Sequence, residues 1–119
     1  MTEVKPLYWV GSSKKDLTAL PEEVQDVFGY AFFLAQVGKK HAAAKPLQGF
    51  GSAGVLEVVE DWHGDTYRAV YTVRFTAAVF VLHVFKKKST KGIETPQRDL
   101  DLIRERLKVA EAKAKELSP

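Results

Sequence analysis

The sequence has 119 residues, of which 45% are hydrophobic and 28% are charged, and its formal net charge is +3 at pH 7. These values are ordinary for a soluble globular chain and predict a single domain that spans residues 1–119. The absence of cysteine excludes disulfide bonds, thiolate catalysis and cysteine metal sites, and no apolar run approaches the roughly 20 residues that cross a bilayer.

The first third of the sequence predicts one strand and two helices. The N-terminus lacks the apolar segment of a signal peptide, which together with the lack of cysteine favours a cytoplasmic protein. Residues 7–10, LYWV, have strand character. Ser13 fits the N-cap of a short helix that ends near Leu20. Pro21 fits the first position of a second helix, whose apolar residues recur at helical spacing until Gly38.

The rest of the sequence predicts a loop, three strands and a helix. Residues 41–54 contain three glycines and a proline, which are typical of a loop. Strands are predicted at 55–62, 66–75 and 78–85, joined by turns into antiparallel hairpins. Thr95 fits the N-cap of a long final helix, with Pro96 as its first residue. The predicted fold is α+β, in the order β-α-α-β-β-β-α, with the helical pair and the last helix packed on a small antiparallel sheet.

Strand alternation assigns the side chains of the two longest strands to opposite faces. It groups Arg68 with Arg74 on one face of the first strand and Tyr71 with the core-facing residues on the other. The second strand is apolar on both sides, which is typical of a central strand. One of its faces is predicted to carry Val79, Val81 and Phe85, and the other Phe80, Leu82 and Val84.

Basic residues are concentrated after this strand. Residues 86–119 carry 10 basic and 6 acidic groups, whereas residues 51–85 carry 2 and 4. The excess predicts a surface that binds a phosphate backbone or an acidic partner, although a solvated charged helix explains it equally well. The lysines at 86–88 are expected to leave the core abruptly, with Lys87 on the side opposite Lys86 and Lys88. Arg68 and these lysines are expected on adjacent strands near one edge of the sheet.

Four segments resemble, in order, those of the RelE/ParE superfamily of toxins from bacterial toxin–antitoxin pairs, and more narrowly its HigB-like, phage Gp49-like branch. They are KPLQGFG at 45–51, VLEV at 55–58, YRAVY at 67–71, and LHVFKKK at 82–88 followed by Thr95-Pro96 and a basic helix. The resemblance covers residues 5–112. Two features depart from the branch. Val59 stands where members often carry arginine, and residues 89–93 provide no match for the tyrosine that well-studied relatives carry after the last strand.

The resemblance implies an endoribonuclease, or mRNA interferase, that cleaves mRNA on the ribosome without metal or cofactor. A ribose 2′-hydroxyl would attack the adjacent phosphorus while cations stabilise the charged phosphorane. Arg68 matches the family's strand arginine, and Lys87, with Lys86 beside it, matches a basic catalytic position. RNA binding is expected of four further cations, Lys88, Arg74, Lys45 and Lys91. His83 is a lower-ranked candidate for proton transfer.

The resemblance also implies two partners, mRNA on the ribosome and a cognate antitoxin of helix-turn-helix type, and no membrane. Exposed sheet edges and the final helix are places where the antitoxin could dock. Three scattered histidines without matching carboxylates give no metal site.

The sequence also allows other roles for these residues and other functions for the protein. Arg68 can instead pair with Glu57 or Glu60, the lysines can simply solubilise a strand end, and His83 can be a satisfied core histidine. The alternative functions are a non-nuclease toxin of the same fold that poisons DNA gyrase, and a non-catalytic basic module of phage origin that binds nucleic acid or protein.

Overall fold

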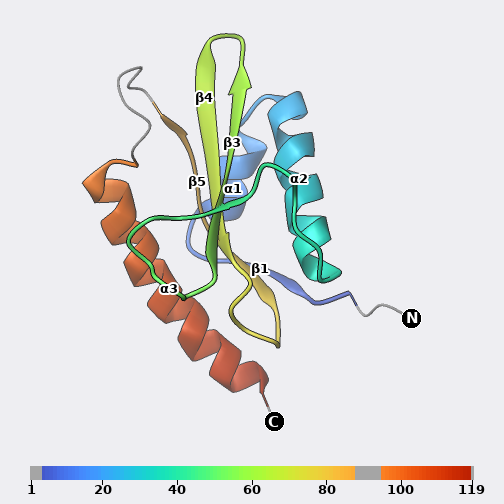
Figure 1. The fold of residues 1–119 in the computed structure, drawn as a ribbon, viewed down its shortest axis with the longest axis vertical. Coiled ribbons are helices and arrows are strands. Elements are labelled where there is room, and N and C mark those ends of the chain that lie inside the picture. The colour runs from blue at the N-terminus through green and yellow to red at the C-terminus, as the bar shows by residue number, and fades with distance from the viewer. Residues whose placement is uncertain (1–3, 88–94, 119) are drawn as a thin grey trace.

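The computed structural model describes residues 4–87 and 95–118. Its elements are β1 (Leu7–Trp9), α1 (Ser13–Thr18), α2 (Glu22–Gln36), β2 (Lys45–Pro46), β3 (Val55–Trp62), β4 (Asp65–Thr72), β5 (Val79–Lys87) and α3 (Gln97–Leu117). A five-stranded, mostly antiparallel sheet separates α1 and α2 on one face from α3 on the other (Figure 1). The predicted α+β architecture is therefore confirmed. No helix in the described ranges is long and apolar enough to cross a membrane.

The strands follow the order β1-β5-β4-β3-β2. β5 lies between β1 and β4, as its two apolar faces predicted. β1 joins the sheet as expected, and it pairs parallel to β5, with Leu7 opposite Val79. β2 was not predicted. It consists of two residues inside the expected loop, and it adds to the edge of β3 by pairing Lys45 with Glu57.

A β-bulge in β5 overturns the face assignment predicted for the second half of that strand. Val70 lies opposite His83 whereas Tyr71 lies opposite Val81, so Leu82 is an extra residue in the ladder. The residues after it change phase. Val84 consequently packs on the α2 side together with Val79 and Val81, and Phe85 packs on the α3 side together with Phe80 and Leu82.

The hairpin between β3 and β4 has a two-residue turn, His63 and Gly64, with φ of 49° and 83°. Two positive φ values define a type I′ turn, which matches the twist of the flanking strands. β4 ends earlier than predicted, at Thr72, whose hydroxyl donates to the Gly54 carbonyl at 3.1 Å and accepts the Arg74 amide at 3.2 Å. Arg74 therefore belongs to the connection between β4 and β5 rather than to the strand.

Each predicted helix start is displaced by one residue. Ser12, not Ser13, precedes α1, and the buried Ser13 hydroxyl donates to the Val81 carbonyl at 3.2 Å. Pro21 and Pro96 are N-cap residues rather than first helical residues, and Thr95 does not cap α3. The C-terminal signal of α2 holds, because Gly38 has φ of 81° and its amide donates to the Ala35 carbonyl at 3.1 Å.

Candidate functional site

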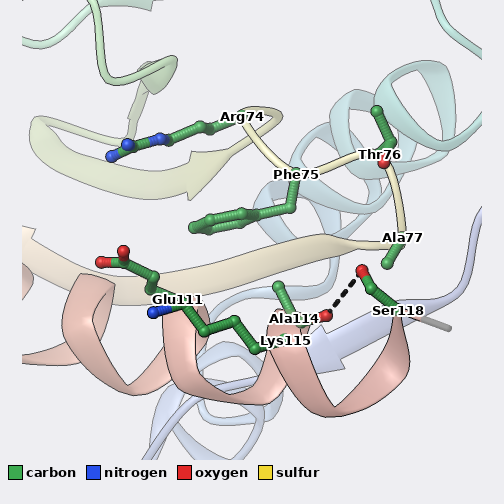
Figure 2. Close-up of a pocket in the computed structure, with 8 residues that line it drawn as sticks. All are labelled: Arg74, Phe75, Thr76, Ala77, Glu111, Ala114, Lys115 and Ser118. Carbon is green, nitrogen blue, oxygen red and sulfur yellow. Dashed lines mark hydrogen bonds between the residues drawn. The ribbon is translucent and has the colours of Figure 1, made fainter.

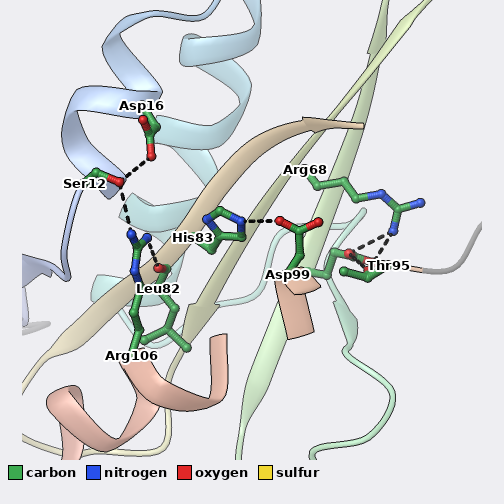
Figure 3. Close-up of polar contacts among 9 residues, drawn as sticks. Ser12, Asp16, Arg68, Leu82, His83, Thr95, Asp99 and Arg106 are labelled. Atoms are coloured by element: carbon green, nitrogen blue, oxygen red, sulfur yellow. Dashed lines mark hydrogen bonds and ion pairs between the residues drawn. The ribbon is translucent and has the colours of Figure 1, made fainter. Parts of the chain in front are cut away.

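Arg68 lies on β4, on the face of the sheet that α3 covers. Its Nη1 donates to Glu57 Oε2 at 2.9 Å and to Thr95 Oγ1 at 3.3 Å, and Thr95 Oγ1 donates to the same Glu57 oxygen at 3.0 Å (Figure 3). One carboxylate oxygen thus joins β3, β4 and the residue before Pro96. Of the two acidic partners predicted for Arg68, Glu57 is the correct one. Glu60 pairs with Tyr67 in the ladder, so its side chain points to the opposite face.

This ion pair is largely buried. The Arg68 side chain is 6% exposed and that of Glu57 is 14% exposed. Their attraction is screened less by water than it would be at the surface, and the guanidinium is held in one orientation. A phosphate group can reach Arg68 only if part of its surroundings moves.

Lys86 and Lys87 lie on opposite faces of β5, as alternation predicted. Lys87 is buried and lies opposite Thr66, two residues before Arg68 on β4. Arg68 and Lys87 are therefore diagonal neighbours on one face, with a typical separation of about 7–8 Å. Lys86 points to the other face, where its Nζ is 3.2 Å from Asp65 Oδ2.

The expectation that the lysine cluster leaves the core is thus wrong for Lys87. β4 and β5 are adjacent as predicted. β5 lies next to the edge strand β1, which pairs only with residues 79–81, so the described sheet has no strand on the outer side of Lys86 and Lys87. Lys88 and Lys91 lie outside the described residues.

The other two cations proposed for RNA binding lie at different distances from Arg68. Lys45 is exposed, and its pairing with Glu57 puts it on the same face as Arg68. Arg74 is also exposed, but it follows the other end of β4, about 20 Å along the strand direction from Arg68. There it lines a hollow of about 420 Å³ between the β4–β5 connection and the last turns of α3, with Phe75, Glu111 and Lys115 (Figure 2).

His83 ties β5 to the first turn of α3. Its Nε2 is 2.8 Å from Asp99 Oδ1 (Figure 3). Its ring stacks on Phe85 with a centroid distance of 4.5 Å. The side chain is buried, and its Nδ1 has no hydrogen-bond partner within the described residues. Burial lowers the pKa of His83 below its ordinary value, although the Asp99 carboxylate opposes this shift. These contacts support the core-histidine reading.

We expect the stability of the protein to fall on acidification, in part through His83. Its lowered pKa means that the unfolded chain binds a proton more readily near pH 6.5 than the folded chain does. The contribution of His83 to the free energy of unfolding is complete above that pH, and it is lost as the pH falls toward the lower pKa of the folded state. Urea unfolding between about pH 7 and pH 5 should therefore show a smaller loss of stability for His83→Gln than for the wild type. His63→Gln, which removes an exposed imidazole, is the control, and equal slopes for all three proteins would contradict the prediction.

Sequence reasoning missed the contacts that α3 makes with the rest of the site. Arg106 donates to the carbonyl of the bulge residue Leu82 at 2.9 Å and to Ser12 Oγ at 3.1 Å, and Ser12 donates to Asp16 at 2.7 Å (Figure 3). Arg106 therefore provides a hydrogen bond to a β5 carbonyl and is not part of a basic helix face that only contacts solvent. Tyr71 is fully buried as predicted, and burial raises its pKa to about 12.

The arrangement provides cations and a carboxylate. Within residues 4–87 and 95–118, no group of three histidine, aspartate or glutamate residues could hold a metal ion. Guanidinium and ammonium groups bind phosphate oxygens and stabilise developing negative charge. A carboxylate such as Glu57 can accept a proton from a hydroxyl group. This set suits phosphoryl chemistry that is independent of metal.

Comparison with known families gives one match. Residues 15–108, more than three quarters of the chain, match the family model described as "Phage derived protein Gp49-like (DUF891)". No curated protein matches the chain. The matched range contains Glu57, Arg68, Lys86, Lys87 and Thr95, and the resemblance to the Gp49-like branch is confirmed.

Proposed function

The chain belongs to the phage-derived Gp49-like family of RelE/ParE-like toxins from toxin–antitoxin systems, and from this premise we propose that it is an endoribonuclease that cleaves mRNA on the ribosome. The observation that carries the proposal is the position of three cations on one face of the sheet, beside the Glu57 carboxylate of β3. The cations are Lys45 on β2, Arg68 on β4 and Lys87 on β5. A row of cations on one face is what a phosphate backbone requires.

The proposed reaction is an attack of the 2′-hydroxyl oxygen on the adjacent phosphorus. The bond from phosphorus to the 5′-oxygen breaks, which leaves a 2′,3′-cyclic phosphate and a 5′-hydroxyl. Among the described residues, Glu57 is the carboxylate paired with Arg68, and we assign it as the acceptor of the 2′-hydroxyl proton. Arg68 stabilises the negative charge on the phosphorane oxygens, and Lys87 assists it. The leaving 5′-oxygen takes up a proton from solvent water, and the proton on Glu57 returns to solvent.

The test is induced expression in a bacterial host, with growth recorded and mRNA 5′-ends mapped. We expect growth arrest and new ends inside translated frames. A translation inhibitor added before induction should abolish the new ends, because the proposed substrate is mRNA on the ribosome. Cuts that persist without translation would contradict ribosome dependence.

Lys87 and Lys86 offer a matched pair of variants. We expect Lys87→Met to lower the cleavage rate by about tenfold or more, because it removes a cation from the Arg68 face. Lys86→Met should change the rate less than about threefold, because its ammonium group lies on the other face beside Asp65. The rates come from primer extension on a translated message, with circular dichroism to check folding. Equal losses in the two variants would remove Lys87 from the proposed site.

A second candidate function is that of a same-fold toxin without nuclease activity, of the type that poisons DNA gyrase. The burial of Arg68 and its pairing with Glu57 favour this candidate, since both give the arginine a structural role. Growth arrest without new mRNA ends would support it. No arrest at all would favour the non-catalytic basic binding module.

The family also motivates a proposal about partners. We propose that a cognate antitoxin of helix-turn-helix type neutralises the protein in the cytoplasm, where its mRNA substrate is translated. Co-expression of an adjacent small helix-turn-helix gene should restore growth. Failure of such a gene to restore growth in a host that arrests would contradict this pairing.

A further inference from the structure

The solvent side of α2 carries two aromatic side chains that are about half exposed, and one of them, Tyr30, contacts His41 edge-on with a centroid distance of 5.8 Å. Tyr30 is 57% exposed and Phe33 is 48% exposed. They are three residues apart, so they lie on the same side of the helix. The opposite side packs into the core through Val24, Phe28, Ala31, Phe32 and Ala35. Neighbouring exposed aromatic residues are typical of an interaction surface.

Gly29 lies beside this aromatic pair, in the middle of α2. A glycine there destabilises a helix by about 1 kcal/mol relative to alanine. The fold gives no reason for it, because a Cβ at this position would meet no described atom within 4 Å. A residue without a side chain on an outer helix face lets another backbone approach closely. Gly29 therefore suggests a contact from outside the chain.

The charges along the same helix have opposite signs at its two ends. Glu22, Glu23 and Asp26 are exposed in the first half, and Lys39 and Lys40 are exposed just after the last turn. These charges stabilise α2 itself, because acidic groups lie near the positive N-terminal end of its dipole and basic groups near the negative C-terminal end. They also favour a second helix of the same pattern that runs antiparallel, since the acidic end of each then meets the basic end of the other. A nucleic acid fits poorly, because three carboxylates would face its phosphates.

We propose that α2 forms the interface of a homodimer with two-fold symmetry. The two α2 helices cross antiparallel, with Tyr30 and Phe33 of each copy packed over Gly29 of the other. In Figure 1, α2 lies across the sheet from α3, so the dimer leaves the α3 face of the sheet accessible. The proposal does not depend on ribonuclease activity.

The free edge of β3 is a poorer site for a second copy. β2 covers only the first part of β3, opposite Leu56 and Glu57. Pairing of two copies through the remaining edge would bring together Glu60 and Asp61 from both chains, and like charges on adjacent strands repel. Antiparallel pairing of two α2 helices brings together opposite charges and avoids this repulsion.

Sedimentation equilibrium of the full chain tests the proposal. One helix from each copy gives a small interface, so we expect a Kd of about 10–300 µM. Phe33→Ser should weaken the dimer at least about tenfold. Val109→Ser on α3 is the matched control, because Val109 is 57% exposed, and it should leave the Kd unchanged. A wild type that stays monomeric at about 1 mM overturns the proposal.

Charge reversal provides the sharper test. One variant carries Glu22→Lys, Glu23→Lys and Asp26→Lys, and the other carries Lys39→Glu and Lys40→Glu. Each alone should dimerise at least about tenfold more weakly, whereas an equimolar mixture should form a heterodimer, because both ends are then complementary. A mixture that associates no better than its components overturns the antiparallel arrangement.

Gly29→Ala distinguishes an effect on the dimer interface from an effect on the stability of α2. Alanine should raise the melting temperature of the monomer and at the same time weaken the dimer, because its methyl group lies where the second helix approaches. A Gly29→Ala protein that is more stable and dimerises as tightly as the wild type would contradict the close approach.

Discussion

Replacing Arg68 by alanine is expected to lower the rate of mRNA cleavage by a factor of about 10²–10³, the usual effect of removing a group that stabilises transition-state charge. The guanidinium is held by Glu57 and Thr95 on the face that also carries Lys87 and Lys45. Primer extension on a translated message gives the rate. Arg68→Lys should recover only part of it, because an ammonium group lacks the planar, bidentate geometry of the guanidinium.

Two controls separate catalysis from folding for this arginine. Arg74→Ala removes an exposed arginine near the other end of the same strand, and its rate should stay within about threefold of the wild type. Urea unfolding must show that Arg68→Ala is folded at the temperature of the assay. A folded Arg68→Ala protein that cleaves mRNA at the wild-type rate would remove Arg68 from the site and favour its structural role.

The helices and most strands were predictable because their patterns are long and their ends carry strong local signals. The apolar stripe of α2 ends at Gly38, which has a positive φ. The turn at His63-Gly64 contains a glycine, which readily adopts the positive φ of a two-residue hairpin turn. β2 was missed because two residues carry no periodicity. The starts of α1 and α3 were displaced because Ser13 and Thr95 direct their hydroxyl groups to tertiary partners instead of the helix.

The candidate site was predictable only in part. Alternation correctly put Arg68 on one face of β4 and separated Lys86 from Lys87, and Glu57 was one of two acidic partners considered. Burial of Lys87 was not predictable, because a run of three lysines looks like a solvated strand end. The bulge at Leu82 also has no sequence signature, since every residue around it is a good strand former.

The bulge has a consequence for the whole α3 face. By shifting the phase of β5, it turns Phe85 toward the same face as Leu82, and it leaves the Leu82 carbonyl to accept from Arg106 of α3. His83, on the other side of the bulge, holds Asp99 in the first turn of the same helix. Two polar contacts from one strand irregularity thus fix α3 against the sheet, and with it Thr95, which contacts Arg68.

Removal of the Glu57 carboxylate is expected to be the most destabilising change in this cluster. Glu57→Ala removes the carboxylate that lies 2.9 Å from the buried Arg68 guanidinium and should lower the free energy of unfolding by about 3–5 kcal/mol, measured by urea unfolding. Thr95→Val removes two hydrogen bonds to charged groups but leaves the ion pair in place, and it should cost about 1.5–3 kcal/mol. A loss below about 1 kcal/mol for Glu57→Ala would show that the buried Arg68 charge does not depend on the Glu57 carboxylate, and it would contradict the prediction.

The double variant Arg68→Met with Glu57→Leu then distinguishes a structural pair from a functional one. Apolar residues of similar volume often replace a buried ion pair without loss of stability. The double variant should therefore recover most of the free energy of unfolding that Glu57→Ala loses. Its cleavage rate should nevertheless be no higher than that of Arg68→Ala, because the double variant lacks both the cation that stabilises the phosphorane and the proposed proton acceptor. A double variant that is both stable and active would show that the ion pair serves folding alone, and the catalytic cation would have to lie elsewhere on the protein.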